Sequence, residues 1–182
     1  MTTIEPRLRG PAVRDAILGR ARDLFDAHGI RPVSADRVIA EAGVSKVTFY
    51  RHFASKDQLV VAYLEEQLER VHQALRERGG APASVDEAAA MLADELCRPG
   101  FRGCPFINAA AEYADPDHPV REVVARFRGW MTDVIAAWLG TQGIDDRAVA
   151  EQIMMLRDGA MVAGYLDGDP AGVAVRLAEG IR

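Results

Sequence analysis

AGVSKVTFYRHF, residues 42–53, contains the turn that decides the fold of the N-terminal part of this 182-residue chain. A short segment with apolar Val38 precedes the turn, and a second short segment with Phe49 and Phe53 follows it. Gly43 stands between the two and can take the positive φ that a tight turn between helices often needs. A helix, a short glycine-containing turn and a second helix make up a helix-turn-helix, so the segment predicts that motif.

The side chains of the second predicted helix suit the DNA major groove, where the second helix of such a motif lies. Phe49 and Phe53 are four residues apart, so they share one side of the helix and are expected to hold it to a core. Lysine and arginine bind phosphate or guanine edges, threonine and valine methyl groups contact thymine, and tyrosine and histidine donate to phosphates. Serines that begin helices offer backbone amides to phosphates. The residues expected to contact DNA are Ser34, Ser45, Lys46, Val47, Thr48, Tyr50, Arg51, His52 and Lys56.

Charge is distributed unevenly along the chain, whose net charge is −5. Residues 1–54 carry nine basic and six acidic residues, and the rest of the chain carries 13 basic and 21 acidic ones. The two parts therefore have net charges of +3 and −8. Because phosphate binding depends on local rather than net charge, a basic head is compatible with DNA binding, although chance would produce the same asymmetry.

Almost every periodic segment has the 3.6-residue period of an α-helix, and the alternation typical of strands is missing. The pattern predicts an all-α fold of about nine helices. They are expected at residues 11–28, 34–42, 45–53, 55–78, 84–98, 105–114, 120–139, 146–167 and 170–181. We expect an N-terminal three-helix domain with the helix-turn-helix over residues 1–55 and a larger helical body over residues 56–182.

Several classes of protein are disfavoured by what the sequence lacks. It has no signal-peptide-like apolar start and no stretch near the roughly 20 apolar residues of a membrane span, so we expect a cytoplasmic protein without a membrane partner. Cys97 and Cys104 are too few for a disulfide framework and lack histidines at zinc-ligand spacing, so no metal is expected. Without a glycine-rich phosphate loop, a G-x-S-x-G motif or a histidine paired with a nucleophile, neither enzyme activity nor a cofactor is expected.

Residues 13–64 resemble the DNA-binding domain of the TetR family of transcriptional regulators. The segment ILGRARDLFDAHGIRPVSADRVIAEAGVSKVTFYRHFASKDQLVVAYL is similar to the first four helices of that domain, in order and without a gap. The resemblance implies four positions on the recognition helix and two DNA-backbone positions just beyond it, respectively Lys46, Val47, Thr48 and Tyr50, and His52 and Lys56. It also implies a homodimer that binds a double-stranded palindromic operator and acts as a repressor released by a small-molecule effector.

In that family the helices after the fourth form a ligand-binding and dimerisation domain, and residues 101–121 and 156–170 resemble one subgroup of it. Polar groups within apolar helical stripes are costly to bury without a partner, so they are candidates for lining a pocket unless they pair with each other. Methionine and tryptophan at helical spacing form either an adaptable pocket wall or plain core. The candidate ligand-binding residues are Cys104, Phe106, Asn108, Glu112, Met131, Trp138, Met154, Arg157 and Asp158.

Small residues in the last two predicted helices permit the close approach of another helix. The resemblance implies that they form a four-helix interface with a second subunit. The candidate interface residues are Ala150, Gly159, Ala160, Ala163 and Gly164. A twofold dimer would place two recognition helices about 34–36 Å apart, one turn of DNA, to read a palindrome.

Two alternatives to a ligand-responsive regulator stay open. Cys97 and Cys104 bracket a short turn with Arg98 and Arg102 nearby to favour thiolates, which suggests a thiol redox switch. Two unrelated buried cysteines would have the same spacing. The other alternative is a helical small-molecule-binding protein that never touches DNA, in which Gly43 merely ends a helix and the polar residues after it form a solvated face.

Overall fold

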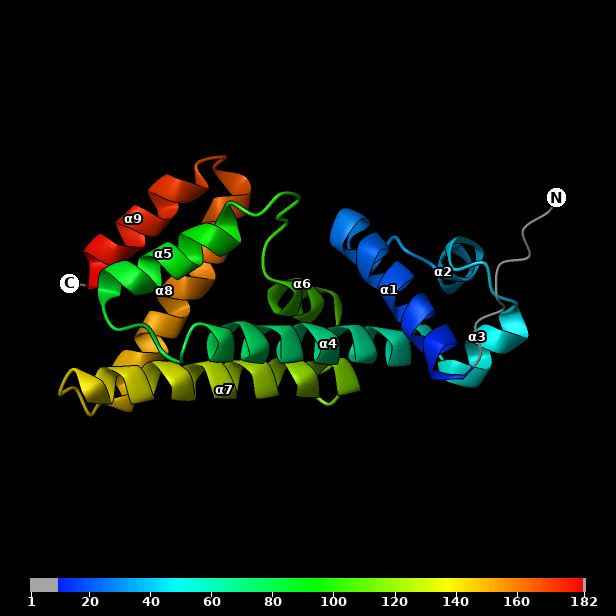
Figure 1. Cartoon of the computed structure of the whole chain (residues 1–182), viewed down its shortest axis with the longest axis horizontal. Coiled ribbons are helices and arrows are strands. Elements are labelled where there is room, and N and C mark those ends of the chain that lie inside the picture. The colour runs from blue at the N-terminus through cyan, green and yellow to red at the C-terminus, as the bar shows by residue number, and fades with distance from the viewer. Residues whose placement is uncertain (1–9, 182) are drawn as a thin grey trace. The chain divides into compact units, whose positions relative to one another are not determined.

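Helices and the loops that join them, with no strand, make up residues 10–181, which are the residues that the computed structural model describes (Figure 1). The prediction of an all-α fold with about nine helices is confirmed. Nine helices lie within the described residues, namely α1 (Pro11–His28), α2 (Ala35–Glu41), α3 (Lys46–His52), α4 (Lys56–Glu77), α5 (Val85–Leu96), α6 (Pro105–Glu112), α7 (Pro119–Thr141), α8 (Arg147–Leu166) and α9 (Pro170–Ile181).

Side chains that cap the helices explain why several of them begin where they do. The hydroxyl oxygens of Ser34, Ser45 and Ser84 each accept a hydrogen bond, at 3.1 Å, from the backbone N–H three residues further on. The carboxylate of Asp146 accepts one at 2.8 Å from the backbone N–H of Ala148. Each bond satisfies a donor that the first turn of the helix leaves free, so short polar residues at these positions start α2, α3, α5 and α8.

Two compact units make up the fold, and the boundary between them falls within α4, after Tyr63. The first turns of α4 belong to the N-terminal unit because their side chains pack on α1. The ring of Tyr63 meets the ring of Phe25 edge-on at 5.3 Å, and its hydroxyl donates to the carboxylate of Asp26 at 2.6 Å. The domain boundary expected from the sequence, at residue 55, therefore excludes the first turns of α4, which complete the packing of the N-terminal unit.

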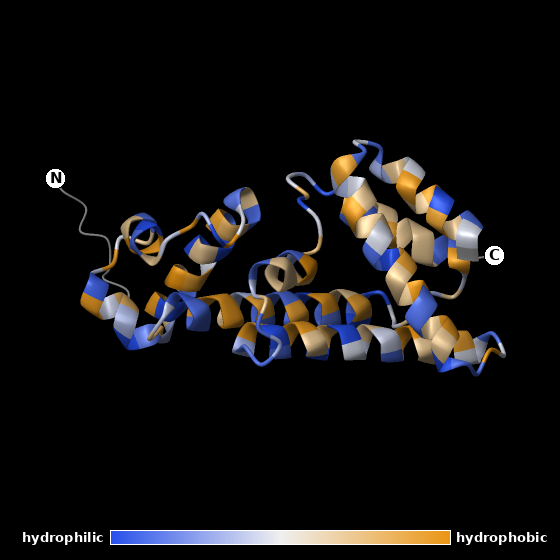
Figure 2. Ribbon diagram, turned by 180° about the vertical axis from the view of Figure 1, so that it is seen from behind, coloured by the Kyte–Doolittle hydropathy of each residue, from blue (hydrophilic) through white to orange (hydrophobic). Residues whose placement is uncertain are grey.

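The second unit consists of the rest of α4 and helices α5 to α9. α4 lies beside α7, and both run in the same direction, since Glu65 pairs with Arg126 and, further along, the ring of His72 meets that of Trp130 at 4.2 Å (Figure 1). α5 packs on α9, and α8 packs on α7 and α9. Figure 2 shows that these helices carry both apolar and hydrophilic stripes, as expected of helices with one buried face.

Between residues 10 and 181, no helix is both long and apolar enough to cross a membrane. α8, for example, is 20 residues long but carries several charged side chains. Within the same residues, no three His, Cys, Asp or Glu side chains gather in an arrangement that would hold a metal ion.

Candidate functional site

The turn between α2 and α3 has the geometry that the sequence predicts. Gly43 has a φ of +63°, which is in the left-handed region that residues with a Cβ rarely adopt. A Cβ at this position would meet nothing within 4 Å, so the backbone conformation and not the space available favours glycine here. Phe49 on α3 and Phe53, which directly follows the helix, are buried in the N-terminal unit and anchor α3 by one face.

The opposite face of α3 is open to solvent. Val47 is 78% exposed and Tyr50 is 42% exposed, which is unusual for large apolar side chains. Lys46 and Arg51 are exposed beside them. Ser45 and Thr48 are bonded to each other through their hydroxyls at 2.9 Å, so they stiffen the first turn of the helix. This surface, which we call the α3 face, combines positive charge, an aromatic hydroxyl and methyl groups.

One ion pair of the α3 face does not follow from the sequence pattern. The ammonium of Lys46 lies 3.2 Å from the carboxylate of Asp36 on α2, and both side chains are mostly exposed. An exposed pair of this kind adds little stability. Lys46 is therefore oriented by Asp36 but remains available to exchange that carboxylate for a phosphate or a base edge.

Of the other predicted DNA contacts, Ser34 and Lys56 have structural partners of their own, and His52 has one ring nitrogen buried in the protein. The Oγ of Ser34 caps α2. The ammonium of Lys56 donates to the carbonyl of Ile30 at 2.7 Å, so it fixes the loop between α1 and α2. The Nε2 atom of His52 is buried and has no hydrogen-bond partner in the described residues, so in this conformation it cannot reach a phosphate.

A cavity of about 540 Å³ lies inside the second unit, between α4, α5, α7, α8 and α9. Five of the nine candidate ligand-binding residues line it, namely Cys104, Phe106, Met131, Trp138 and Arg157. The wall also contains residues that were not predicted from the sequence, such as Gln67 and Trp130. Both residues lie three or four positions from apolar residues on the same helix, and this spacing could have placed them on the buried face of that helix. We call this space the inner cavity.

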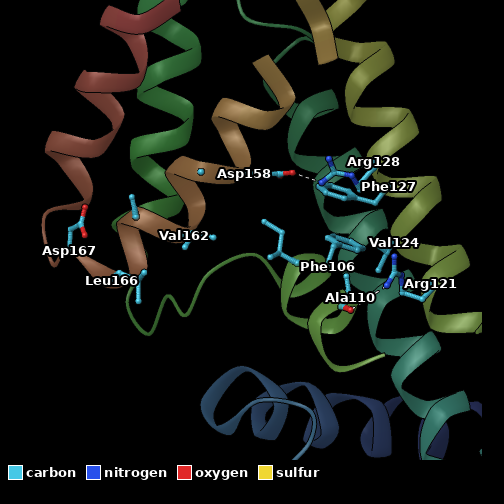
Figure 3. A pocket seen from close by; sticks show the side chains of 13 residues that line it. Phe106, Ala110, Arg121, Val124, Phe127, Arg128, Asp158, Val162, Leu166 and Asp167 are labelled. Carbon is cyan, nitrogen blue, oxygen red and sulfur yellow. Dashed lines mark hydrogen bonds and ion pairs between the residues drawn. The ribbon is translucent and has the colours of Figure 1, made fainter. Parts of the chain in front are cut away.

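A second cavity of about 660 Å³ is more open and lies between α6, α7 and α8 (Figure 3). Phe106 also lines it, together with the candidate Asp158. In Figure 3 Val162 and Leu166 on α8 lie across the space from Phe106, and Asp158 reaches Arg128, to which it is ion-paired. Both α8 side chains are exposed, so this cavity is continuous with the outer surface of α8.

The three remaining ligand candidates line neither of these two cavities. Asn108 is exposed, and its amide donates to the carbonyl of Arg102 at 3.0 Å. Met154 is buried in the core, and Glu112 is half-buried near the end of α6. Asn108 and Met154 therefore serve local structure, as a polar or large side chain in an apolar stripe also can.

The predicted dimer interface also needs correction. Ala150, Ala160 and Gly164 are buried within the chain itself. A Cβ on Gly164 would lie 2.7 Å from the side chain of Leu96, so this glycine allows α8 to approach α5 of the same subunit. Gly159 is exposed and Ala163 is half-buried on the other side of α8. That outer side also carries Met155, Val162 and Leu166, all exposed; we call it the α8 outer face.

The two cysteines differ in environment. Cys97 is exposed at the end of α5, whereas Cys104 is 2% exposed at the start of α6, and both are free thiols. The guanidinium of Arg157 lies 3.9 Å from the sulfur of Cys104. A cation therefore lies beside the Cys104 thiol, as the redox hypothesis requires. It belongs to Arg157 on α8, whereas the sequence pointed to Arg98 and Arg102 in the turn.

We expect Cys97 to react with Ellman's reagent at least about ten times faster than Cys104 in the native protein, because a buried thiol must wait for local opening. Stopped-flow absorbance would resolve two phases. The Cys97→Ser variant should lose the fast phase alone. A single fast phase from both thiols in the native protein would contradict the burial of Cys104 and would strengthen the redox alternative.

Comparison with known proteins extends over both units. Residues 17–63 match the family described as bacterial regulatory proteins, tetR family. The chain is 41% identical to SCO4454, a TetR-family transcriptional regulator from Streptomyces coelicolor, with 93% of this chain and 92% of that chain covered and a TM-score of 0.85. It is 26% identical over 176 residues to the HTH-type transcriptional regulator YjdC of Escherichia coli, which covers 92% of each chain. The multidrug binding protein EbrR, in complex with malachite green, shares the fold at 23% identity and a TM-score of 0.73, over 94% of this chain and 96% of that chain.

Proposed function

Because the chain belongs to the TetR family of transcriptional regulators, we propose that it is a repressor that binds a palindromic operator as a homodimer and is released by a small-molecule effector. The protein would act in the cytoplasm, where bacterial DNA lies. The observation that carries the proposal is the α3 face, whose exposed Lys46, Val47, Tyr50 and Arg51 stand on a helix anchored by two buried phenylalanines. Such a rigid, basic and partly apolar surface suits readout in the major groove.

The α8 outer face supports the dimer in the proposal. Met155, Val162 and Leu166 are separated by seven and four residues, so they form one stripe along α8. All three are exposed in the single chain. An apolar stripe of this kind is expected to be covered in solution, and a twofold partner would cover it with the same residues.

The inner cavity supports the effector in the proposal. It lies between helices of one subunit and has aromatic side chains in its wall, as small-molecule sites commonly do. Release would be a coupling free energy between this cavity and the α3 face, carried by a ligand that binds one arrangement of the subunits better than the other.

A thiol-responsive regulator is the second candidate, and the contact between Arg157 and Cys104 favours it. In that case the effector would be an oxidant or an electrophile that reacts at Cys104. The two candidates differ in one observable property: a Cys104→Ser variant keeps its response to a reversibly bound effector but loses its response to oxidants. The alternative without DNA function is disfavoured by the family assignment.

The proposal is tested by fluorescence anisotropy of labelled DNA from upstream of the coding region of this protein, against a scrambled duplex of the same length. We expect specific binding that weakens as the salt concentration rises, because protein cations displace counterions from phosphates. Equal and weak binding to both duplexes would count against a nearby operator. A ligand screen by melting temperature would then become the way to find the effector.

A further inference from the structure

The residues that line the inner cavity follow α7 over three turns, with α4 and α5 also contributing to the wall. α7 contributes residues spaced by three and four along one stripe, namely Phe127, Trp130, Met131, Val134, Ile135 and Trp138. α4 and the residue that follows it contribute Gln67, Arg70, Val71, Ala74, Leu75 and Arg78, with the same spacing. The eleven steps from Phe127 to Trp138 correspond to about 16 Å along the helix axis. A ligand that fills the cavity is therefore elongated, and aromatic walls favour a flat apolar body.

One end of the inner cavity contains a buried hydrogen-bond donor. Trp138 lines the cavity and is 6% exposed. Its indole Nε1 is buried and has no hydrogen-bond partner among the described residues. Buried indole N–H groups are normally paired, so the unpaired one of Trp138 calls for an acceptor, which a ligand in the cavity would supply after a small shift of the ring.

The other end of the inner cavity contains an arginine. The guanidinium of Arg157 lies over the ring of Phe127, with its central carbon 5.3 Å from the ring centroid. Its Nη1 donates to the carboxylate of Asp158 at 3.1 Å, and among the described residues its Nη2 reaches only the sulfur of Cys104, at 4.0 Å. A sulfur is a weak acceptor, so Nη2 retains donor capacity.

The charges around Arg157 do not balance. Asp158 is shared between Arg157 and Arg128, so this cluster has two cations and one anion. The other arginines that line the cavity have a carboxylate each, in the pairs Arg70 with Glu66, Arg78 with Asp94 and Arg98 with Glu95. Arg128 and Asp158 line the second cavity, so the excess positive charge lies directly beside the Arg157 end of the inner cavity.

We propose that the effector is an elongated, aromatic organic anion. Its anionic group pairs with the guanidinium of Arg157, its flat body lies between the aromatic walls, and a neutral oxygen at its far end accepts the indole N–H of Trp138. This assignment rests on the proposed function only in calling the ligand an effector, since the chemistry of the cavity holds for any ligand that binds there.

The probe is 4′-methoxybiphenyl-4-carboxylate, which has an anionic end, a flat aromatic body and an oxygen at the far end. Two analogues each change one end: the carboxamide removes the charge, and 4′-ethylbiphenyl-4-carboxylate replaces the methoxy group by an isosteric ethyl group. By isothermal titration calorimetry without DNA, we expect the probe to bind at least about tenfold more tightly than the carboxamide, and about three- to tenfold more tightly than the ethyl analogue. Equal affinities for the three compounds, or no binding of any of them, would overturn the proposal.

Variants assign each end of the probe to its residue. Arg157→Met should remove the preference for the carboxylate over the carboxamide and keep the preference for methoxy over ethyl. Trp138→Phe should do the reverse. Arg70→Met is the matched control, since it removes a wall arginine that has its own carboxylate and should leave both preferences unchanged. Preferences that survive in both test variants would refute the assignment, and the compound series on the wild-type protein decides the ligand class if a variant does not fold.

Operator release separates this inference from the proposed function. The probe is added to the complex of protein and operator while anisotropy is recorded. Tight binding by calorimetry without release would mean that the ligand class is right but that the cavity does not control DNA binding. Release by the carboxylates and not by the carboxamide would support both.

Discussion

Replacing Lys46 and Tyr50 together by alanine is expected to weaken operator binding about 10²- to 10⁴-fold, because each contact to a base edge or phosphate contributes about 1–3 kcal/mol. Both side chains belong to the α3 face and neither is part of the core. The fold should therefore survive: we expect the melting temperature and the affinity for ligands of the inner cavity to stay close to those of the wild-type protein. Anisotropy titrations and thermal denaturation on the same preparations provide both readouts.

Two single variants control for charge. Arg147→Ala removes an exposed cation that is paired with Asp133 at 2.8 Å, as Lys46 is paired with Asp36, but it lies at the start of α8. It should leave operator affinity unchanged. Asp36→Asn frees Lys46 from its carboxylate and removes a negative charge beside the DNA, so affinity should rise. Wild-type affinity in the double alanine variant would show that α3 does not read the operator.

The helix-turn-helix could be predicted in detail because its determinants are local. The serine caps, the glycine in the turn and the two phenylalanines four residues apart all act within a few residues of each other. Local rules also separate the buried side of α3 from its exposed side. These rules do not predict contacts with distant parts of the chain. The ammonium of Lys56, which was predicted to contact phosphate, instead donates to the carbonyl of Ile30, 26 residues away in the sequence.

Small residues on α8 show why the dimer surface could not be read from the sequence. A glycine permits close approach of any helix, whether it belongs to the same subunit or to a partner. At Gly164 the neighbour is Leu96 of the same chain. Exposed apolar side chains on the opposite side, such as Val162, are the better signal, but they become visible only once the buried side is known.

The inner cavity could be predicted only in part. The spacing of Phe127, Met131 and Trp138 identifies one face of α7 as apolar, and the structure places all three in the cavity wall. Spacing alone does not separate a wall from a filled core, because both have the same period. The distinction needs the unpaired indole N–H of Trp138 and the excess cation at Arg157, which are properties of the assembled helices.

Changing Val162 and Leu166 together to glutamate is expected to produce a monomer and to abolish specific operator binding at micromolar protein concentrations. The two side chains are 43% and 70% exposed and stand four residues apart on the α8 outer face. In a twofold dimer each substitution is present in both subunits, so each carboxylate would be buried twice in an apolar contact. The free energy needed to bury these charges would exceed the free energy of association of an interface of ordinary size. Each monomer would then bind one half-site alone and lose an avidity of about 10²- to 10⁴-fold.

Sedimentation velocity and anisotropy on the same samples separate the loss of the dimer from misfolding. Ile144→Glu is the matched control: it places the same charge on an exposed apolar residue, but in the loop between α7 and α8. This variant should stay dimeric and bind the operator as the wild-type protein does. If the double variant remains a dimer, the contact between subunits lies elsewhere. If it is a monomer with undiminished operator affinity, the half-sites act independently and a palindrome is not required. The expected result, a folded monomer without specific binding, would make the α8 outer face the element that couples the two α3 helices on DNA.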